Sequence, residues 1–147
     1  MTAISIDPGC SATGICIWKD HWPVNGMTLR PKEKRYPARY VDLYARFDEA
    51  MNKIEKTYGQ IVRVAIEDPR ARKVPQQPAE DVKKLWWATA MMWTYWLELC
   101  FEPVLVDKGR TPKGQADLLA VNYRLTGCSQ HARDALLIGF LAGFGRK

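Results

Sequence analysis

The sequence predicts an α/β fold built on a mixed five-stranded sheet, with three antiparallel strands followed by two parallel strands and helices flanking both faces. Three observations predict this class. Two short β-prone runs, Ala3–Asp7 and Thr13–Trp18, flank a turn that contains Gly9. The near-continuous apolar run Ile61–Glu67 is typical of a central parallel strand. After it, strands alternate with helices, which favours helices on both faces of the sheet.

The other elements follow in chain order. Met27–Leu29 is a short third strand, and Pro103–Asp107 is the fifth. Apolar residues recur every three or four positions from Tyr44 to Tyr58, which predicts a helix that ends at Gly59. Three more helices are predicted, over residues 80–101, 111–127 and 130–144, the last with Ser129 as its N-cap.

The composition indicates how the chain is organised and what kind of partner it has. With 147 residues, 47% of them hydrophobic and 26% charged, the chain is expected to form one domain spanning residues 1–147. Its net charge is +6, and an excess of positive charge is the first sign of a polyanionic partner.

Four scattered cysteines form no C-x-x-C pair, which argues against zinc and favours a reducing compartment. The longest uncharged apolar stretch, Leu85–Leu97, is shorter than the ~20 residues of a membrane span. The N-terminus has no basic and apolar signal sequence. We therefore expect a cytoplasmic protein without a membrane partner.

Four ligand-type residues stand at the ends of predicted elements. Asp7 ends the first strand and Glu67 the fourth, while His131 and Asp134 share one face of the first turn of the last helix. If the first and fourth strands are neighbours, the two carboxylates lie side by side, and they repel one another unless cations neutralise them. Oxygen ligands with one imidazole suit Mg²⁺ or Mn²⁺. A pair of such ions, about 3.5–4 Å apart, is a standard device for phosphodiester hydrolysis.

Each of these residues also has a purely structural interpretation. An Asp before Pro-Gly commonly forms a turn, and a Glu at a strand end is commonly solvated. Asp134 also complements the dipole at a helix N-terminus. The conjunction of the four favours a metal site.

Basic residues accompany the acidic ones. Lys113 lies in the first turn of its predicted helix, where the macrodipole disfavours a cation, and a phosphate bound there would explain it. A solvated face explains its neighbours Lys108 and Arg110 equally well. The residues predicted to contact nucleic-acid phosphates are Arg70, Arg72, Lys73, Lys108, Arg110 and Lys113.

The helix over residues 80–101 carries apolar side chains around too much of its girth for one core face to cover. It is either buried on all sides within the chain or part of a two-fold interface between two copies, and we favour the interface. The predicted dimer-interface residues are Leu85, Trp86, Met92, Trp93 and Trp96.

Three segments carry a family resemblance. "ISIDPGCSATGICIW", "VAIED" and "SQHARDALLIG", in this order, resemble the RuvC-type Holliday junction resolvases of the RNase H-like nuclease superfamily. The resemblance implies an RNase H-like fold and a Mg²⁺-dependent homodimer that places two symmetric nicks in a four-way junction. It implies that Asp7, Glu67, His131 and Asp134 are the metal-site residues, although many members carry Asp where His131 stands. It also implies that Lys113 lies beside the acidic cluster.

We therefore expect a crossover junction endodeoxyribonuclease that uses two Mg²⁺ or Mn²⁺ ions per active site and has no small-molecule cofactor. Asp7, Glu67, His131, Asp134 and Lys113 are its expected catalytic residues. The loop "DPRARKVPQQP" after Glu67 departs from several relatives because it has no aromatic residue. Two other functions stay open, namely a nuclease for structured RNA and a non-catalytic junction-binding protein.

Overall fold

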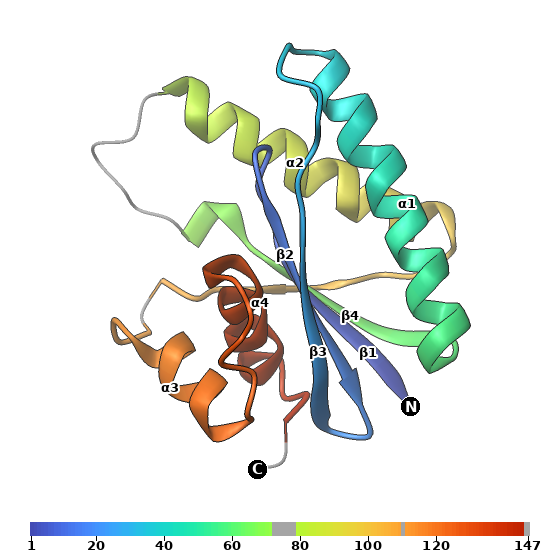
Figure 1. Ribbon diagram of the computed structural model, residues 1–147. Helices are drawn as coiled ribbons and strands as arrows, with labels where there is room; N and C mark the ends of the chain where they lie inside the picture. The colour runs from blue at the N-terminus through green and yellow to red at the C-terminus, as the bar shows by residue number, and fades with distance from the viewer. Residues whose placement is uncertain (72–78, 110, 146–147) are drawn as a thin grey trace.

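The computed structural model describes residues 1–71, 79–109 and 111–145. Its sheet has the strand order β3-β2-β1-β4-β5 (Figure 1). The first three strands pair antiparallel, and β1–β4 and β4–β5 pair parallel, which confirms the predicted mixed sheet. The strands are β1 (Thr2–Asp7), β2 (Thr13–Lys19), β3 (Trp22–Leu29), β4 (Ile61–Glu67) and β5 (Val104–Val106). The helices are α1 (Ala38–Tyr58), the 3₁₀ turn η1 (Pro69–Ala71), α2 (Ala79–Glu98), α3 (Gln115–Asn122) and α4 (Gln130–Leu141).

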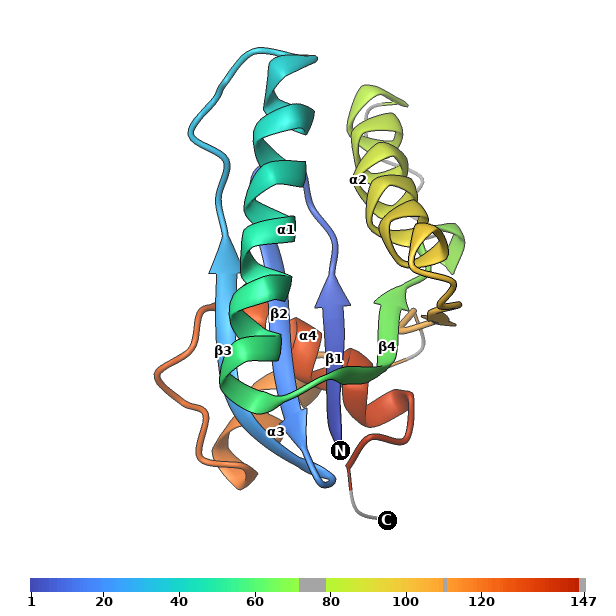
Figure 2. The same cartoon turned by 90° about the vertical axis from the view of Figure 1, so that its right-hand side faces the viewer.

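Helices cover both faces of the sheet, with α1 and α2 on one face and α3 and α4 on the other (Figure 2). Successive residues of β1 face opposite sides because side chains alternate along a strand. Ile4 and Ile6 belong to the core under α1 and α2, which also contains Phe47 and Met92. Ala3 belongs to the second core, under α3 and α4. A strand buried on both faces explains the uninterrupted apolar run in its sequence.

Helix α4 packs very closely on β2, and this contact positions the end of the helix that carries His131. A Cβ placed on Gly14 would lie 1.9 Å from the carbonyl oxygen of His131. Ser129 is the N-cap of α4, as predicted, and its hydroxyl accepts a hydrogen bond from the backbone N–H of Ala132 at 3.2 Å. On the same face, the hydroxyl of Ser5 donates to the carbonyl of Ala135 at 2.6 Å.

Several element bounds differ from the prediction. Strand β3 begins at Trp22 because its early residues pair with β2, a long-range contact that its weak local pattern does not reveal. Helix α3 is shorter than predicted because Gly114 before it and Arg124 after it both have left-handed backbone conformations, with φ of 84° and 60°. Helix α2 likewise ends before Cys100, whose φ is 56°.

In the part of the chain that the structure describes, every helix is too short or too polar to cross a membrane.

Candidate active site

Two buried carboxylates lie side by side at the carboxyl ends of β1 and β4. Ile6 pairs with Ile66 in the parallel register, so Asp7 and Glu67 are the next residues along adjacent strands. Their exposed fractions are only 3% and 2%. The turn after Asp7 is closed by Thr13, whose hydroxyl donates to the carbonyl of Gly9 at 2.8 Å. Two charges so deeply buried are costly unless a cation or hydrogen bonds compensate them.

Lys108 supplies a cation to this pair. Its Nζ lies 3.1 Å from Asp7 Oδ1 and 3.3 Å from Glu67 Oε2. Burial lowers the pKa of Lys108, but the charges of Asp7, Glu67 and Asp134 outweigh burial and raise the pKa above its usual value. The sequence prediction gave Lys108 a phosphate contact and overlooked this ion-pair position. One signal could have found it, because Lys108 lies just beyond β5, at the same sheet edge as both carboxylates.

The N-terminal turn of α4 faces Asp7. Nδ1 of His131 lies 3.5 Å from Asp7 Oδ2. This interaction with Asp7 raises the pKa of His131, although partial burial opposes it. For Asp7 itself, burial raises the pKa, but hydrogen bonds with His131 and Glu67 and the charge of Lys108 hold the net pKa well below the usual range. The carboxyl group of Asp7 is therefore held in its ionised form.

Asp134 lies one turn further along α4. Its Oδ1 accepts a hydrogen bond from Nε2 of Gln130 at 3.3 Å. It borders a cavity of about 380 Å³ together with Lys108 and Lys113. Asp134 also contributes to the raised pKa values of Lys108 and His131, so its charge acts on the same group of side chains.

The side chains at this site are of the kinds that bind a divalent metal, but they do not form a closed cage. As the side chains stand, no three His, Cys, Asp or Glu residues within the described ranges come together closely enough to enclose an ion. However, Asp7 and Glu67 already share one cation, the ammonium group of Lys108. Carboxylate oxygens with one imidazole are the donors that Mg²⁺ and Mn²⁺ accept. The chemistry of these residues therefore fits a hard divalent ion.

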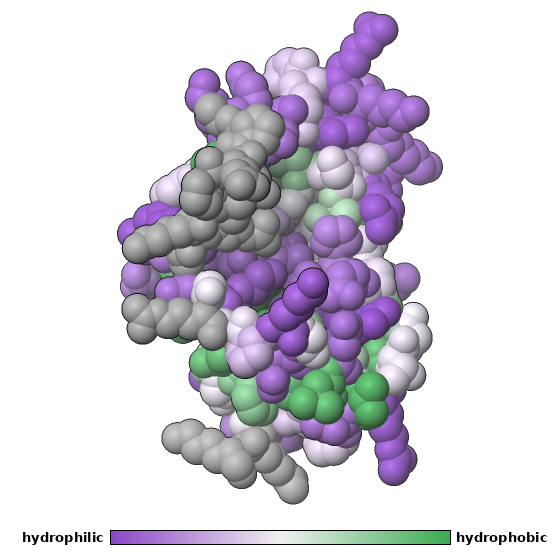
Figure 3. Space-filling model, turned by 90° about the vertical axis from the view of Figure 1, so that its left-hand side faces the viewer, coloured by the Kyte–Doolittle hydropathy of each residue, from purple (hydrophilic) through white to green (hydrophobic). Residues whose placement is uncertain are grey.

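The predicted phosphate-binding residues differ in their surroundings. Lys113 is exposed and precedes α3, rather than lying in its first turn as predicted, because α3 begins only at Gln115. The exposed guanidinium of Arg70 is paired with Asp68, with Nη2 to Oδ2 at 2.7 Å. The predictions for Arg72, Lys73 and Arg110 lie outside the described residues. Figure 3, which views the molecule from the side of η1 and α3, shows mainly hydrophilic side chains across the middle of this face.

The predicted dimer interface on α2 needs a correction. Met92 is fully buried and Trp96 is 3% exposed, and both belong to the core between α2 and the sheet. They are therefore covered within the chain and cannot be the contact surface for a second copy. Trp86 is exposed, and Leu85 and Trp93 are half-buried. The prediction overlooked Trp87, which at 64% is the most exposed tryptophan of this helix.

The strand order and the mixed pairing define the RNase H-like class of fold, with carboxylates at the ends of its two central parallel strands. Within that class, the chain has the fold of the RuvC structures. It superimposes on RuvC from Thermus thermophilus in complex with a Holliday junction substrate with a TM-score of 0.76, at 18% identity, over 98% of this chain and 93% of that one. A second T. thermophilus RuvC structure gives a TM-score of 0.71 at 17% identity, over 98% and 94%. By sequence, the chain matches no protein-family model and no curated protein.

Proposed function

We propose that this chain is a structure-selective DNA endonuclease that resolves Holliday junctions by paired symmetric nicks, with residues 1–147 as its nuclease domain. The observation that carries the proposal is the pair of buried carboxylates, Asp7 and Glu67, faced by His131 and linked by Lys108 in a RuvC fold. Two adjacent buried carboxyl groups need a cation or a shared proton to offset their repulsion, so the pair is a natural place for a metal ion to bind. The net charge of +6 supports a polyanionic substrate.

In this proposal Asp7, Glu67, Asp134 and His131 hold the metal ions, Mg²⁺ or Mn²⁺, two in each active site. When bound, such ions activate the attacking water and stabilise the leaving 3′ oxygen, and cleavage yields 5′-phosphate and 3′-hydroxyl ends. Asp7, which is kept ionised, supplies a buried negative charge that contacts His131 of α4. Lys108 neutralises the carboxylates before metal binds, and Lys113, which lines the same cavity as Asp134, would contact the scissile phosphate.

The role of Lys108 can be measured through stability alone. We expect Lys108→Met to lower the free energy of unfolding in EDTA by about 3 kcal/mol, because it leaves two adjacent carboxylates buried without their cation. Excess Mg²⁺ should restore part of this loss, since a ligand that binds only the folded state stabilises it. Urea denaturation with and without Mg²⁺ measures the free energy of unfolding. Lys53→Met, at an exposed position of α1, is the control. If Lys108→Met and wild type are equally stable in EDTA, Lys108 does not stabilise the two buried carboxylates.

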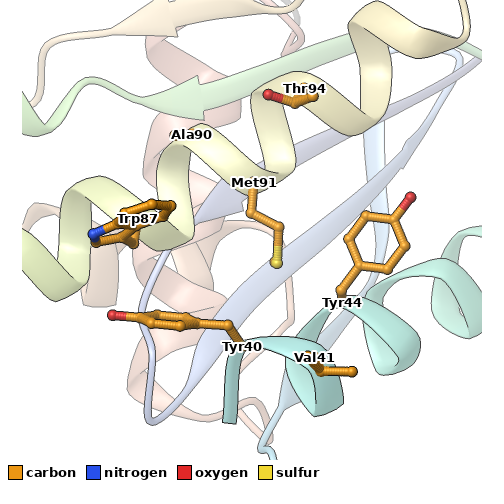
Figure 4. A pocket seen from close by; sticks show the side chains of 7 residues that line it. All are labelled: Tyr40, Val41, Tyr44, Trp87, Ala90, Met91 and Thr94. Atoms are coloured by element: carbon orange, nitrogen blue, oxygen red, sulfur yellow. The ribbon is translucent and has the colours of Figure 1, made fainter. Parts of the chain in front are cut away.

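Resolution by paired nicks requires two active sites, and we propose that a second copy of the chain supplies the other one. The surface for this contact is the apolar groove between α1 and α2, with a volume of about 450 Å³. Figure 4 shows Tyr40 and Tyr44 of α1 opposite Trp87 and Met91 of α2. Trp87 and Val41 at the groove are 64% and 71% exposed, an unusual amount of apolar surface to leave in water. A two-fold contact here matches the two-fold symmetry of a four-way junction.

We expect Trp87→Lys to weaken the dimer by at least about tenfold in dissociation constant, because exposed tryptophans at the centre of an interface carry much of its binding energy. Sedimentation velocity over a range of protein concentrations measures this change. Trp22→Lys, at an exposed tryptophan of β3 that does not line the groove, is the control. A dimer as tight as wild type in Trp87→Lys would show that this groove is not the interface.

A further inference from the structure

A second, polar cavity opens directly beside the acidic residues. Its volume is about 500 Å³, and Asp7 and His131 form one of its walls. The other walls come from the loop after β1, the segment between β3 and α1, and the start of α2. Among the described residues that line it, Arg30, Arg39 and Lys84 are cations, whereas the carboxylates are Asp7 and Asp81. With Asp7 engaged by Lys108 and His131, the rest of the cavity carries an excess of positive charge.

Two of these cations converge on one aromatic ring. The guanidinium carbon of Arg39 lies 5.3 Å from the centroid of the Tyr36 ring, and Nζ of Lys84 lies 5.0 Å from the same centroid. Nη1 of Arg39 also donates to the hydroxyl of Tyr36 at 3.3 Å. Such cation–π contacts hold charged side chains in place without neutralising them. Tyr36 therefore positions Arg39 and Lys84, which come from two different helices.

Arg39 and Lys84 also contact the loop that follows Asp7 at the end of β1. Nη1 of Arg39 also donates to Oγ of Ser11, four residues beyond Asp7, at 3.3 Å. Lys84 has a weak link to Asp81, with Nζ 4.0 Å from Oδ1. The backbone carbonyl of Lys84 accepts a hydrogen bond from the thiol of Cys10 at 2.6 Å. Arg39 and Lys84 line the same cavity, and an anion bound there would be attracted by both charges.

We infer that this cavity binds a backbone phosphate of the cleaved DNA strand next to the scissile phosphate, with Arg39 and Lys84 contacting its oxygens and Tyr36 positioning both. The inference rests on the proposed function, because it takes the substrate to be DNA cut at Asp7. Arginine and lysine contacts to phosphate orient a nucleic acid without reading its sequence. In this position they would fix the strand against the acidic residues.

The test is the salt dependence of DNA binding by the Arg39→Gln/Lys84→Gln double variant. Binding to a fluorescent four-way junction is measured by anisotropy in EDTA, over a series of KCl concentrations. We expect affinity at low salt to fall about tenfold or more, and the slope of log K against log salt to shrink by about one, as when one phosphate contact is lost. Lys53→Gln/Lys56→Gln is the matched control, since it removes two exposed charges at the far end of α1. A double variant that matches this control in affinity and slope would overturn the inference.

The positioning role of Tyr36 has its own pair of variants. Tyr36→Phe keeps the ring and should bind the junction within about twofold of wild type, with the same salt slope. Tyr36→Leu removes the ring and should reduce both affinity and slope in the direction of the double variant. If Phe and Leu behave alike while circular dichroism shows both folded, Tyr36 does not position the cations.

Single-stranded DNA separates this inference from the proposed function. In one outcome, wild type binds junction and single strand equally well, and the double variant binds the single strand more weakly and with a smaller salt slope. This result would support the phosphate site and contradict the junction specificity. In the other outcome, wild type prefers and cleaves the junction, and the double variant binds both DNAs like its control. This result would support the proposed function and contradict the phosphate site.

Discussion

Replacement of Asp7 by asparagine is expected to abolish cleavage of a four-way DNA junction while leaving junction binding intact. Asparagine has the shape of aspartate but no charge, so it cannot hold a divalent cation as a carboxylate does. Asp7 is 3% exposed, and its oxygens lie 3.1 Å from Lys108 and 3.5 Å from His131, so the substitution removes the carboxylate that joins these two side chains. The loss of several kcal/mol of transition-state stabilisation corresponds to a rate reduction of roughly a thousandfold or more.

Single-turnover cleavage of a labelled junction in Mg²⁺ and in Mn²⁺, together with a gel shift in EDTA, measures both parts of this expectation. Asp20→Asn is the control, because Asp20 is an exposed carboxylate that pairs with the N-terminus, at the opposite end of β1 from Asp7. Full cleavage by Asp7→Asn would overturn the assignment of Asp7 to a metal site. The wild-type result also separates the other functions. Cleavage confined to structured RNA would favour an RNA nuclease, and binding without cleavage in either metal would favour a non-catalytic junction-binding protein.

Gly14→Ala is expected to destabilise the fold and to abolish the proposed junction cleavage together. An added Cβ would lie 1.9 Å from the carbonyl oxygen and 2.2 Å from the carbonyl carbon of His131. These are backbone atoms of α4, so relief requires the whole helix to move away from β2. Such overpacking costs about 3 kcal/mol or more. The movement would also separate His131 and Asp134 from Asp7.

Urea denaturation gives the stability of Gly14→Ala, and junction cleavage in Mg²⁺ gives its activity. Gly127→Ala is the matched control, because a Cβ there would meet nothing within 4 Å. It should change stability by less than about 0.5 kcal/mol. If Gly14→Ala unfolds at the same urea concentration as wild type and cleaves at the same rate, α4 does not depend on this close contact.

Local patterns were sufficient for most of the fold. The alternation of β-prone runs, the apolar run of Ile61–Glu67 and the N-cap Ser129 led to elements that the structure confirms. Expectations failed where an element depends on distant partners or on backbone conformation. Strand β3 extends back to Trp22 through its pairing with β2, and α3 is limited by left-handed residues at each end. Neither a pairing register nor a positive φ at Arg124 has a strong local signature.

The candidate site, like the fold, could be predicted from local sequence only in part. The positions of Asp7 and Glu67 at the ends of two strands, and of His131 and Asp134 in the first turn of a helix, can be read from local sequence. How closely these residues approach one another depends on the register between β1 and β4 and on the packing of α4 against Gly14.

The sequence by itself determined the order and type of the elements, the strand ends that carry carboxylates and the excess of positive charge, because periodicity, capping and composition are local properties. Only the tertiary structure decided that Lys108 joins the carboxylates, that Met92 and Trp96 are buried while Trp87 is exposed, and that Arg39 and Lys84 converge on Tyr36. The physical reason is that a side chain's charge and hydropathy belong to the residue, whereas its burial and its ionic partners depend on which distant elements pack against it.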